Sequence, residues 1–294
     1  MAMPFTTPAA PIWAGLTLDR PRVMAVLNVT PDSFSDGGRL DPETAIAAGI
    51  AMRDDGADIV DVGGESARPG ASPTPPEIER SRILPVIRGL AAAGVLVSVD
   101  TCHAATMAAA LDAGAAIVND ISALSHDPDA AAVVAERGCP VVLMHMRGTP
   151  ATMMGLARYD DVAAEVMAEL AVRVAAAEQA GIGREAIAID PGFGFAKHPP
   201  HSIALLRRLS VLTAMGLPIL AGVSRKGFIG AISGEAEPAR RGPGSVAAGL
   251  FALAQGAAVL RVHDVRETVR AVRVWHALSW TLSKNTQPHR LGGM

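Results

Sequence analysis

Eight short apolar runs, rich in β-branched residues, alternate along this chain with longer alanine-rich segments. Such runs are typical of buried parallel strands, and alanine-rich segments favour helices. The predicted strands are Val23–Leu27, Ile59–Val62, Leu96–Val99, Ala116–Val118, Val141–Met144, Ala186–Ile189, Ile219–Ala221 and Val259–Leu260. Eight such units in about 260 residues match a single-domain (β/α)8 TIM barrel in number and length. A doubly wound open sheet is the structural alternative.

Local signals indicate where several helices begin and end. Asp41 followed by Pro42 combines an N-cap residue with proline at the first helical position. The segments Thr74–Glu77 and Asp264–Glu267 have the spacing of a capping box, although aspartate is only a variant of its hydroxyl residue. A Gly-Ala pair precedes three of the strands, and we expect its glycine to end a helix in the left-handed conformation at Gly56, Gly114 and Gly256.

Each predicted strand is followed by residues that can recognise a ligand. They are Asn28, Gly63–Glu65, Asp100, Asn119, His145, Asp190, Ser224–Lys226, Arg261 and His263. The carboxyl ends of barrel strands meet at one mouth, where active sites of this fold lie, whereas an open sheet spreads them along an edge. Helix capping explains Asp100 or Asn119 individually, but it does not explain the cations, because positive charge is unfavourable at a helix start. The pattern therefore favours a barrel with a site at its mouth.

The loop after the first predicted strand is the most unusual one. Residues Asn28–Gly38 include hydroxyl, carboxylate and turn-forming residues around a single aromatic side chain, Phe34. We expect this loop on the surface, and Pro31 with Gly37-Gly38 suits a segment that bends and closes over a ligand. The alternative is a polar connection with an incidental phenylalanine.

Composition restricts the class of function. The 294-residue chain has a formal net charge of −3, which gives no electrostatic case for nucleic-acid binding. No apolar run reaches membrane-spanning length, and the first residues lack a signal-peptide pattern. Cys102 and Cys139 have neither metal-ligand nor CxxC spacing, so we expect free thiols in the cytoplasm. We predict a lead-in over 1–20, a catalytic domain over 21–282 and a polar, disordered tail over 283–294.

Eight segments of this chain occur together, in order and at nearly the same spacing, in one known family. They are Leu27–Gly38, Asp61–Gly70, Ser98–Thr101, Val118–Ile121, His145–Pro150, Asp190–Gly194, Ser224–Lys226 and Arg261–Asp264. From about residue 12 to residue 282 the chain resembles dihydropteroate synthase, the folate-pathway transferase family. The resemblance implies a (β/α)8 barrel that joins 6-hydroxymethyl-7,8-dihydropterin pyrophosphate to 4-aminobenzoate and releases pyrophosphate. It further implies a Mg2+ cofactor, a homodimer and a sulfonamide target.

The pterin contacts can be considered against the chemistry of the ring. A pterin presents adjacent donors, and one buried carboxylate can accept two parallel hydrogen bonds from them, which makes Asp190 the candidate. Asn119 can both donate and accept toward ring heteroatoms. We expect Arg261 to lay its guanidinium plane over the ring. By resemblance the pocket is completed by Asp100, Met144, Gly222 and Lys226.

The remaining contacts concern pyrophosphate and the second substrate. Pyrophosphate requires cations and donors, which Arg68, Arg261 and His263 supply. Asn28 offers a neutral oxygen to the pyrophosphate site and to a largely hydrated Mg2+ ion. By resemblance the aminobenzoate site forms when loops close over the bound pterin, and it contains Phe34, Arg68, Pro69, Lys226 and the Ser224 backbone. The implied catalytic set is Asp100, Asp190, Lys226, Arg68 and Phe34.

The leaving group indicates the mechanism. Neutralised pyrophosphate leaves readily, and the pterin ring can delocalise the positive charge that remains on its methylene carbon. We therefore expect SN1-like loss of pyrophosphate, followed by attack of the neutral aniline nitrogen. The protein would contribute electrostatic stabilisation and positioning.

Two other functions remain open. A pterin-dependent methyltransferase module shares the barrel and the pterin contacts, but it gives no reason for the Phe34 loop or for the phosphate-binding residues. A catalytically silent pterin-binding paralogue is the second, and the presence of Arg68, Lys226 and Phe34 argues against it. Ala67 replaces a usual hydroxyl residue and Gly227 a larger one, and we expect these departures to tune aminobenzoate or sulfonamide affinity.

Overall fold

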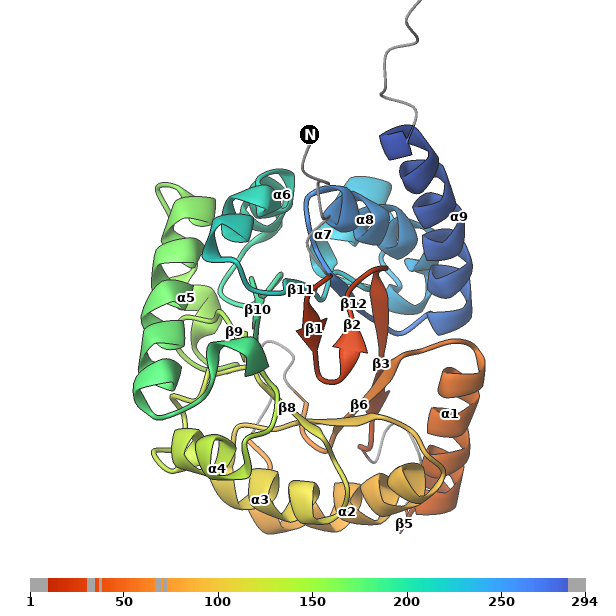
Figure 1. Ribbon diagram of the computed structural model, residues 1–294, viewed down its shortest axis with the longest axis vertical. Helices are drawn as coiled ribbons and strands as arrows, with labels where there is room; N and C mark the ends of the chain where they lie inside the picture. Colours follow the sequence, from red (N-terminus) through yellow and green to blue (C-terminus); the bar gives the residue numbers. More distant parts are fainter. Residues whose placement is uncertain (1–9, 31–34, 37–38, 67–69, 71–72, 285–294) are drawn as a thin grey trace, which may run out of the picture.

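Eight parallel strands form a nearly closed barrel in the computed structural model (Figure 1). The structure describes residues 10–30, 35–36, 39–66, 70 and 73–284. Around the sheet the strands follow the order β10 (Ile187–Asp190), β9 (Val141–Met144), β8 (Ile117–Asp120), β7 (Val97–Asp100), β6 (Ile59–Gly63), β3 (Arg22–Asn28), β12 (Val259–Val262) and β11 (Leu220–Ala221). A parallel bridge between Ile189 and Ile219 connects the two ends of this sheet. The predicted barrel and its eight strands are confirmed, and the open sheet is wrong.

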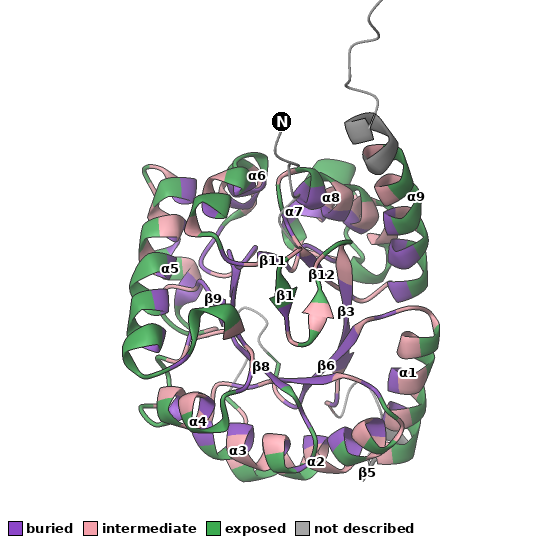
Figure 2. Cartoon of the chain, in the orientation of Figure 1, coloured by how far each residue is buried: buried purple, intermediate pink, exposed green. Residues whose placement is uncertain are grey.

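Helices follow the barrel strands and surround them (Figure 1). They are α1 (Pro42–Asp54), α2 (Pro76–Ala92), α3 (Ala104–Asp112), α4 (Ala130–Arg137), α5 (Val162–Gln179), α6 (Pro199–Arg207), α7 (Gly227–Ser233), α8 (Gly242–Ala254) and α9 (Val265–Lys284). Figure 2 shows that the strands are buried, whereas the helices expose their outer faces. Short 3-10 helices occur at Met153–Leu156, Arg184–Ala186, Leu209–Met215 and Pro238–Arg240. Within the described ranges, no helix is both long and apolar enough to cross a membrane.

Most of the predicted helix boundaries are present. The Asp41 carboxylate caps α1 by accepting two backbone amide hydrogen bonds, each 3.2 Å long. The capping box at Thr74 is wrong, because α2 begins after Pro75 without a side-chain cap, and the Thr74 amide donates instead to Glu65. The three glycines before strands have φ angles of 105°, 106° and 98°, which confirms the left-handed helix ends at Gly56, Gly114 and Gly256.

Side chains on the barrel strands separate into two apolar layers. The outer layer packs against the helices and includes Val60, Val62, Val97, Val99, Ile187 and Ile189. The inner layer fills the barrel and consists of Trp13, Met24, Ile59, Ile117, Val142, Ala188, Leu220 and Val259. Because successive strand residues point to opposite faces, the residue two positions after each inner one also points into the barrel. Above this apolar floor, the strands therefore present Asp61, Asn119, Met144, Asp190, Gly222 and Arg261.

A short hairpin supplies the centre of the floor. It is formed by β1 (Ile12–Trp13) and β2 (Leu16–Thr17), and Figure 1 shows it inside the ring of strands. The Trp13 side chain is only 1% exposed, and its indole Nε1 donates to the Ala186 carbonyl at 3.0 Å. The indole fills the barrel interior and keeps its one polar group paired. A second small hairpin, β4 (Ser35–Asp36) with β5 (Arg39–Leu40), follows β3.

We expect Trp13→Ala to lower the free energy of unfolding by about 3–5 kcal/mol, because it removes a buried aromatic side chain from a packed interior. Urea denaturation followed by far-UV circular dichroism measures this change. The matched control is Ile12→Ala on the same strand, since Ile12 is 64% exposed and should change stability by less than about 0.5 kcal/mol. Equal losses in the two variants would contradict the assignment of Trp13 to the barrel floor.

Candidate active site

A pocket lies at the carboxyl ends of the barrel strands. All seven residues predicted to contact the pterin line it, namely Asp100, Asn119, Met144, Asp190, Gly222, Lys226 and Arg261. They come from five different strands and from the segment after β11, so the fold brings together positions as distant as 100 and 261. The rest of the lining was not predicted: Ile121, Gly192, Phe193 and Phe195.

One arginine connects the strands at the centre of the pocket. Arg261 donates from Nε to Asp61 at 2.6 Å and from Nη2 to Asp100 at 2.5 Å. Asp61 is fully buried and also accepts a hydrogen bond from the Asn119 amide at 2.9 Å. Asp61 therefore positions two of the predicted pterin residues at once. Sequence analysis missed this residue, although a carboxylate within an apolar strand is a signal that could have identified it.

The shared guanidinium leaves the two carboxylates only partly neutralised. Burial raises the pKa of Asp100 to about 7, although Arg261 acts in the opposite direction. Burial alone would lower the pKa of Arg261, but Asp61 and Asp100 together raise it, so the guanidinium stays charged. Asp61 Oδ1 is buried and has no hydrogen-bond partner in the described part of the chain. The base of the pocket is therefore electronegative.

Asp190 depends on a tight turn directly after its strand. Its Oδ1 accepts the Gly192 amide at 2.7 Å, and burial raises the pKa of the Asp190 carboxyl. Gly192 has a φ of 68°, and a Cβ added there would lie 2.0 Å from the His145 carbonyl oxygen, so only glycine fits. A Cβ added at Gly222 would lie 3.5 Å from Asp190 Oδ2. The bare Gly222 leaves that edge of the carboxylate uncovered by a side chain.

Lys226 is the second cation that lines the pocket. Its Nζ lies 4.2 Å from the centre of the Phe195 ring, a cation–π distance. Burial lowers the pKa of Lys226 to about 8, against the attraction of Asp190. The ammonium group therefore loses its proton much more readily than an exposed lysine does.

The other predicted phosphate-binding groups differ in charge and position. His263 Nδ1 lies 3.0 Å from the Ser224 hydroxyl, and burial together with Arg225 lowers the pKa of His263 to about 4. The imidazole is therefore neutral at pH 7. Arg225 pairs with Asp264 through contacts of 3.2 and 2.5 Å, which uses both side chains within the protein. A contact between His263 and an anion would therefore be a hydrogen bond from a neutral imidazole.

Asn28 lies at the edge of the same mouth. In the register of the sheet it pairs with Gly63, which pairs in turn with Asp100. A Cβ added at Gly63 would lie 3.7 Å from Asn28 Oδ1 and 3.6 Å from Asp100 Oδ2, so the bare glycine leaves both oxygens facing one corner. Amide and carboxylate oxygens are hard ligands, and this donor set fits Mg2+. Three further predicted residues, Phe34, Arg68 and Pro69, lie outside the described residues, as does Ala67.

A buried network supports the segment after β10. Lys197, 2% exposed, donates to the Gly192 carbonyl at 3.1 Å, to the Phe195 carbonyl at 3.0 Å and to His145 Nδ1 at 2.8 Å. His145 Nε2 is 3.0 Å from Glu169, so this nitrogen carries the proton and Nδ1 accepts. Burial lowers the pKa of Lys197 to about 7. Sequence analysis missed Lys197, and His145 supports the pocket rather than lining it.

Comparison with known proteins agrees with this geometry. The model of the pterin binding enzyme family matches residues 24–263. Dihydropteroate synthase of Escherichia coli K12 is 46% identical over 264 residues, which cover 89% of this chain and 93% of that protein. The Mycobacterium leprae enzyme is 50% identical over 261 residues, with coverage of 86% and 92%.

Solved structures give the same result. Xanthomonas albilineans dihydropteroate synthase with 4-aminobenzoic acid has a TM-score of 0.85 and 50% identity, covering 90% of this chain and 96% of that one. The same enzyme in complex with 7,8-dihydropteroate has a TM-score of 0.82 and 47% identity, with coverage of 90% and 95%. From the match over most of both sequences, this chain belongs to the dihydropteroate synthase family of pterin-binding enzymes.

Proposed function

We propose that this protein catalyses the condensation of 6-hydroxymethyl-7,8-dihydropterin pyrophosphate with 4-aminobenzoate, giving 7,8-dihydropteroate and pyrophosphate. The observation that carries the proposal is the pocket in which Asp190, Asn119 and Arg261 converge above an apolar floor. Relatives of this chain have been solved with each type of ligand: the Thermus thermophilus enzyme with 4-aminobenzoate and with 6HMPPP, and the Yersinia pestis enzyme with a sulfonamide drug.

The pterin would lie against the electronegative base of the pocket. Asp190 accepts the two donors of the aminopyrimidinone edge, and charge-assisted hydrogen bonds of this kind contribute about 1.5–3 kcal/mol each. Asn119 is held by Asp61, so its carbonyl oxygen is directed to a ring donor. Hydrogen-bond donors of the ligand favour the ionised carboxylate, so pterin binding lowers the pKa of Asp190, whereas burial raises it.

Loss of pyrophosphate would be assisted by groups around the mouth. Arg261 and Lys226 carry positive charge on the pocket side, Arg68 adds a further cation, and neutral His263 can donate a hydrogen bond. Asn28 would hold Mg2+ near Asp100, and a bound ion there would help to neutralise the pyrophosphate charge. In the dissociative mechanism, Arg261 stabilises the transition state by electrostatics and positioning, and no strong base is needed.

We propose that the second substrate binds after the pterin. Asn28 and Gly63 begin the two loops that contain Phe34 and Arg68, so both loops start at the pocket mouth. Phe34, Arg68 and Pro69 would then enclose the aminobenzoate, together with Lys226 and the Ser224 backbone. Sulfonamides would compete for this same site. A cytoplasmic homodimer stays a prediction from the sequence.

A pyrophosphate-release assay with both substrates tests the function. The synthase is expected to release pyrophosphate only when both are present and to form dihydropteroate in equal amount. Pterin binding without any release would favour the silent paralogue, and transfer of a methyl group would favour the methyltransferase module. Positional isotope exchange within dihydropterin pyrophosphate tests the dissociative step, and its complete absence with freely rotating pyrophosphate would indicate concerted displacement.

We expect Phe34→Ala to raise the KM for 4-aminobenzoate by about tenfold, because the aromatic contact proposed with the second substrate would be lost. The KM for the pterin substrate should change much less. Steady-state kinetics with each substrate varied in turn give both values. Equal increases would contradict the closing-loop arrangement.

We expect Asp61→Asn to raise the KM for the pterin substrate by about tenfold or more, because Arg261 and Asn119 lose a charged acceptor worth about 1.5–3 kcal/mol. The KM for 4-aminobenzoate should stay nearly unchanged. The matched control is Ser98→Ala, since Ser98 is the register partner of Asp61, is fully buried and has no hydrogen-bond partner in the described ranges. If both variants raise the KM for the pterin substrate by a similar factor, Asp61 contributes through packing alone.

The pH profile of kcat/KM for the pterin substrate should fall on the alkaline side near pH 8. The pKa of Lys226 is lowered to about 8 in the folded protein, so the group loses its positive charge as the pH rises through that value. Lys226→Arg keeps the charge and should move the alkaline limb to higher pH, even if its maximum rate is lower. If the alkaline limb is unchanged in Lys226→Arg, deprotonation of Lys226 is not its cause.

A further inference from the structure

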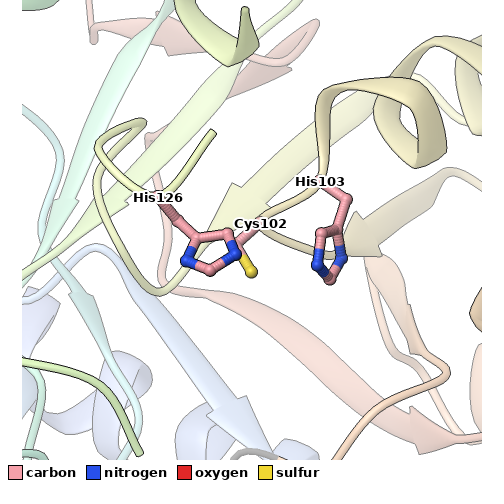
Figure 3. A group of neighbouring side chains, drawn as sticks. All are labelled: Cys102, His103 and His126. Atoms are coloured by element: carbon pink, nitrogen blue, oxygen red, sulfur yellow. The ribbon is translucent and has the colours of Figure 1, made fainter. Parts of the chain in front are cut away.

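A second group of reactive side chains lies beside the barrel mouth. Cys102 and His103 follow β7, and His126 belongs to the connection between β8 and α4 (Figure 3). One ligand atom from each, the Cys102 sulfur and a nitrogen of each imidazole, lie within 4.8 Å of one another. None of the three residues lines the active-site pocket. The proposed synthase reaction therefore does not account for this cluster.

The two imidazole rings are arranged so that they can share an ion. Their centroids are 5.3 Å apart and their planes are inclined by 85°. Figure 3 shows the Cys102 side chain beside the two histidine side chains. His103 Nδ1 is 3.1 Å from Glu79 Oε2, and with this nitrogen occupied Nε2 would be the atom that binds a metal ion. A carboxylate on the outer nitrogen is the usual way in which proteins orient a metal-binding histidine.

Glu79 is independent evidence that a cation can bind near this cluster. Its side chain is 0% exposed on helix α2, and Oε2 also accepts the Thr106 hydroxyl at 3.0 Å. Oε1 is buried and has no hydrogen-bond partner among the described residues. Glu65, Glu79 and His103 form an overlapping group whose ligand atoms also lie within 4.8 Å of one another. An unpaired buried carboxylate oxygen is unfavourable unless a cation is near, so the cluster is built for positive charge.

We propose that Cys102, His103 and His126 bind a divalent transition-metal ion of the Zn2+ type, with Glu79 as the carboxylate that orients His103. One thiolate and two imidazoles are the nitrogen and sulfur donors that Zn2+ prefers, whereas Mg2+ prefers oxygen. Binding forms a metal–sulfur bond and releases the thiol proton of Cys102 to solvent. The fourth tetrahedral position remains for water.

The site would connect two segments that approach the mouth from neighbouring strands. Cys102 is two residues after Asp100, and His126 is six residues after Asp120 at the end of β8. A metal bound by both segments would fix the β7–α3 connection to the β8–α4 loop. It would do so from outside the pocket, so metal content can be measured separately from synthase activity.

Chelator-treated full-length protein, equilibrated with Zn2+ in excess Mg2+ and dialysed, should retain one Zn2+ per chain by elemental analysis. Substitution with Co2+ should give a thiolate-to-cobalt charge-transfer band in the near ultraviolet. Cys102→Ser should abolish this band, and His126→Ala should weaken Zn2+ binding by at least tenfold. Glu79→Gln should keep the band but weaken binding by about 10–100-fold, as is typical when a supporting carboxylate is lost.

Two matched controls separate this site from adventitious binding. Cys139→Ser changes the other cysteine, which is buried after α4, and His198→Ala changes an exposed histidine at the start of α6. Both should bind Zn2+ as the unaltered protein does. His126 is exposed, so His126→Ala should retain the fold, which its Tm without metal verifies. Absence of Zn2+ retention, a Co2+ spectrum without the thiolate band, or binding unaffected by Cys102→Ser and His126→Ala would overturn the proposal.

Discussion

The pairing of Arg261 with two carboxylates is the interaction on which the rest of the pocket depends. Its guanidinium reaches Asp61 on β6 at 2.6 Å, across β3, and Asp100 on β7 at 2.5 Å, across β3 and β6. One positive charge cannot neutralise both carboxylates, and burial holds the pKa of Asp100 near 7 and raises that of Asp190. A ligand that presents N–H donors relieves this excess of acceptors, whereas an apolar ligand of the same shape leaves it in place. Selectivity for a pterin edge thus follows from charge as well as from shape.

The barrel makes this arrangement possible because it separates packing from recognition along each strand. The first inward-facing residue, such as Ile117 or Val259, completes an apolar floor around Trp13. The next inward-facing residue, Asn119 or Arg261 in these strands, is polar and reaches the mouth. Register between strands then fixes the relative heights of these groups, so pterin contacts rest on rigid elements. The residues proposed for the second substrate follow β3 and β6 in the sequence, which suits a site that forms only after the first substrate has bound.

The order of strands and the residues after them could be predicted because these signals are local. Apolar runs, turn glycines and polar strand ends are all readable within a few residues, and five of the seven predicted pterin residues stand at such strand ends, whereas Met144 and Gly222 were given by the family resemblance. Asp61 was missed because it lies inside an apolar strand, where its partner is 200 positions away. Lys197 was missed for a related reason, since a lysine in a loop gives no sign that it will be buried against carbonyl oxygens and His145. Protonation states such as that of His263 depend on burial and on neighbouring arginines, which only the tertiary structure supplies.

Cys102 is a further residue whose surroundings could not be predicted from the sequence. Its spacing from Cys139 indicates no metal site, yet the fold places it beside two histidines from different connections. Strand β7 ends at Asp100, which lines the pocket. Cys102 and His103 belong to the connection after the strand and lie outside the pocket, although they follow Asp100 within three residues. Two chemically distinct cation sites can therefore coexist near one mouth: oxygen donors of Asn28 and Asp100 suit Mg2+, and nitrogen and sulfur donors suit Zn2+. Because the ligands differ in softness, each ion would be directed to its own site. A metal ion at Cys102, His103 and His126 would fix the connection after Asp100 from outside, without placing a second ion against the leaving pyrophosphate.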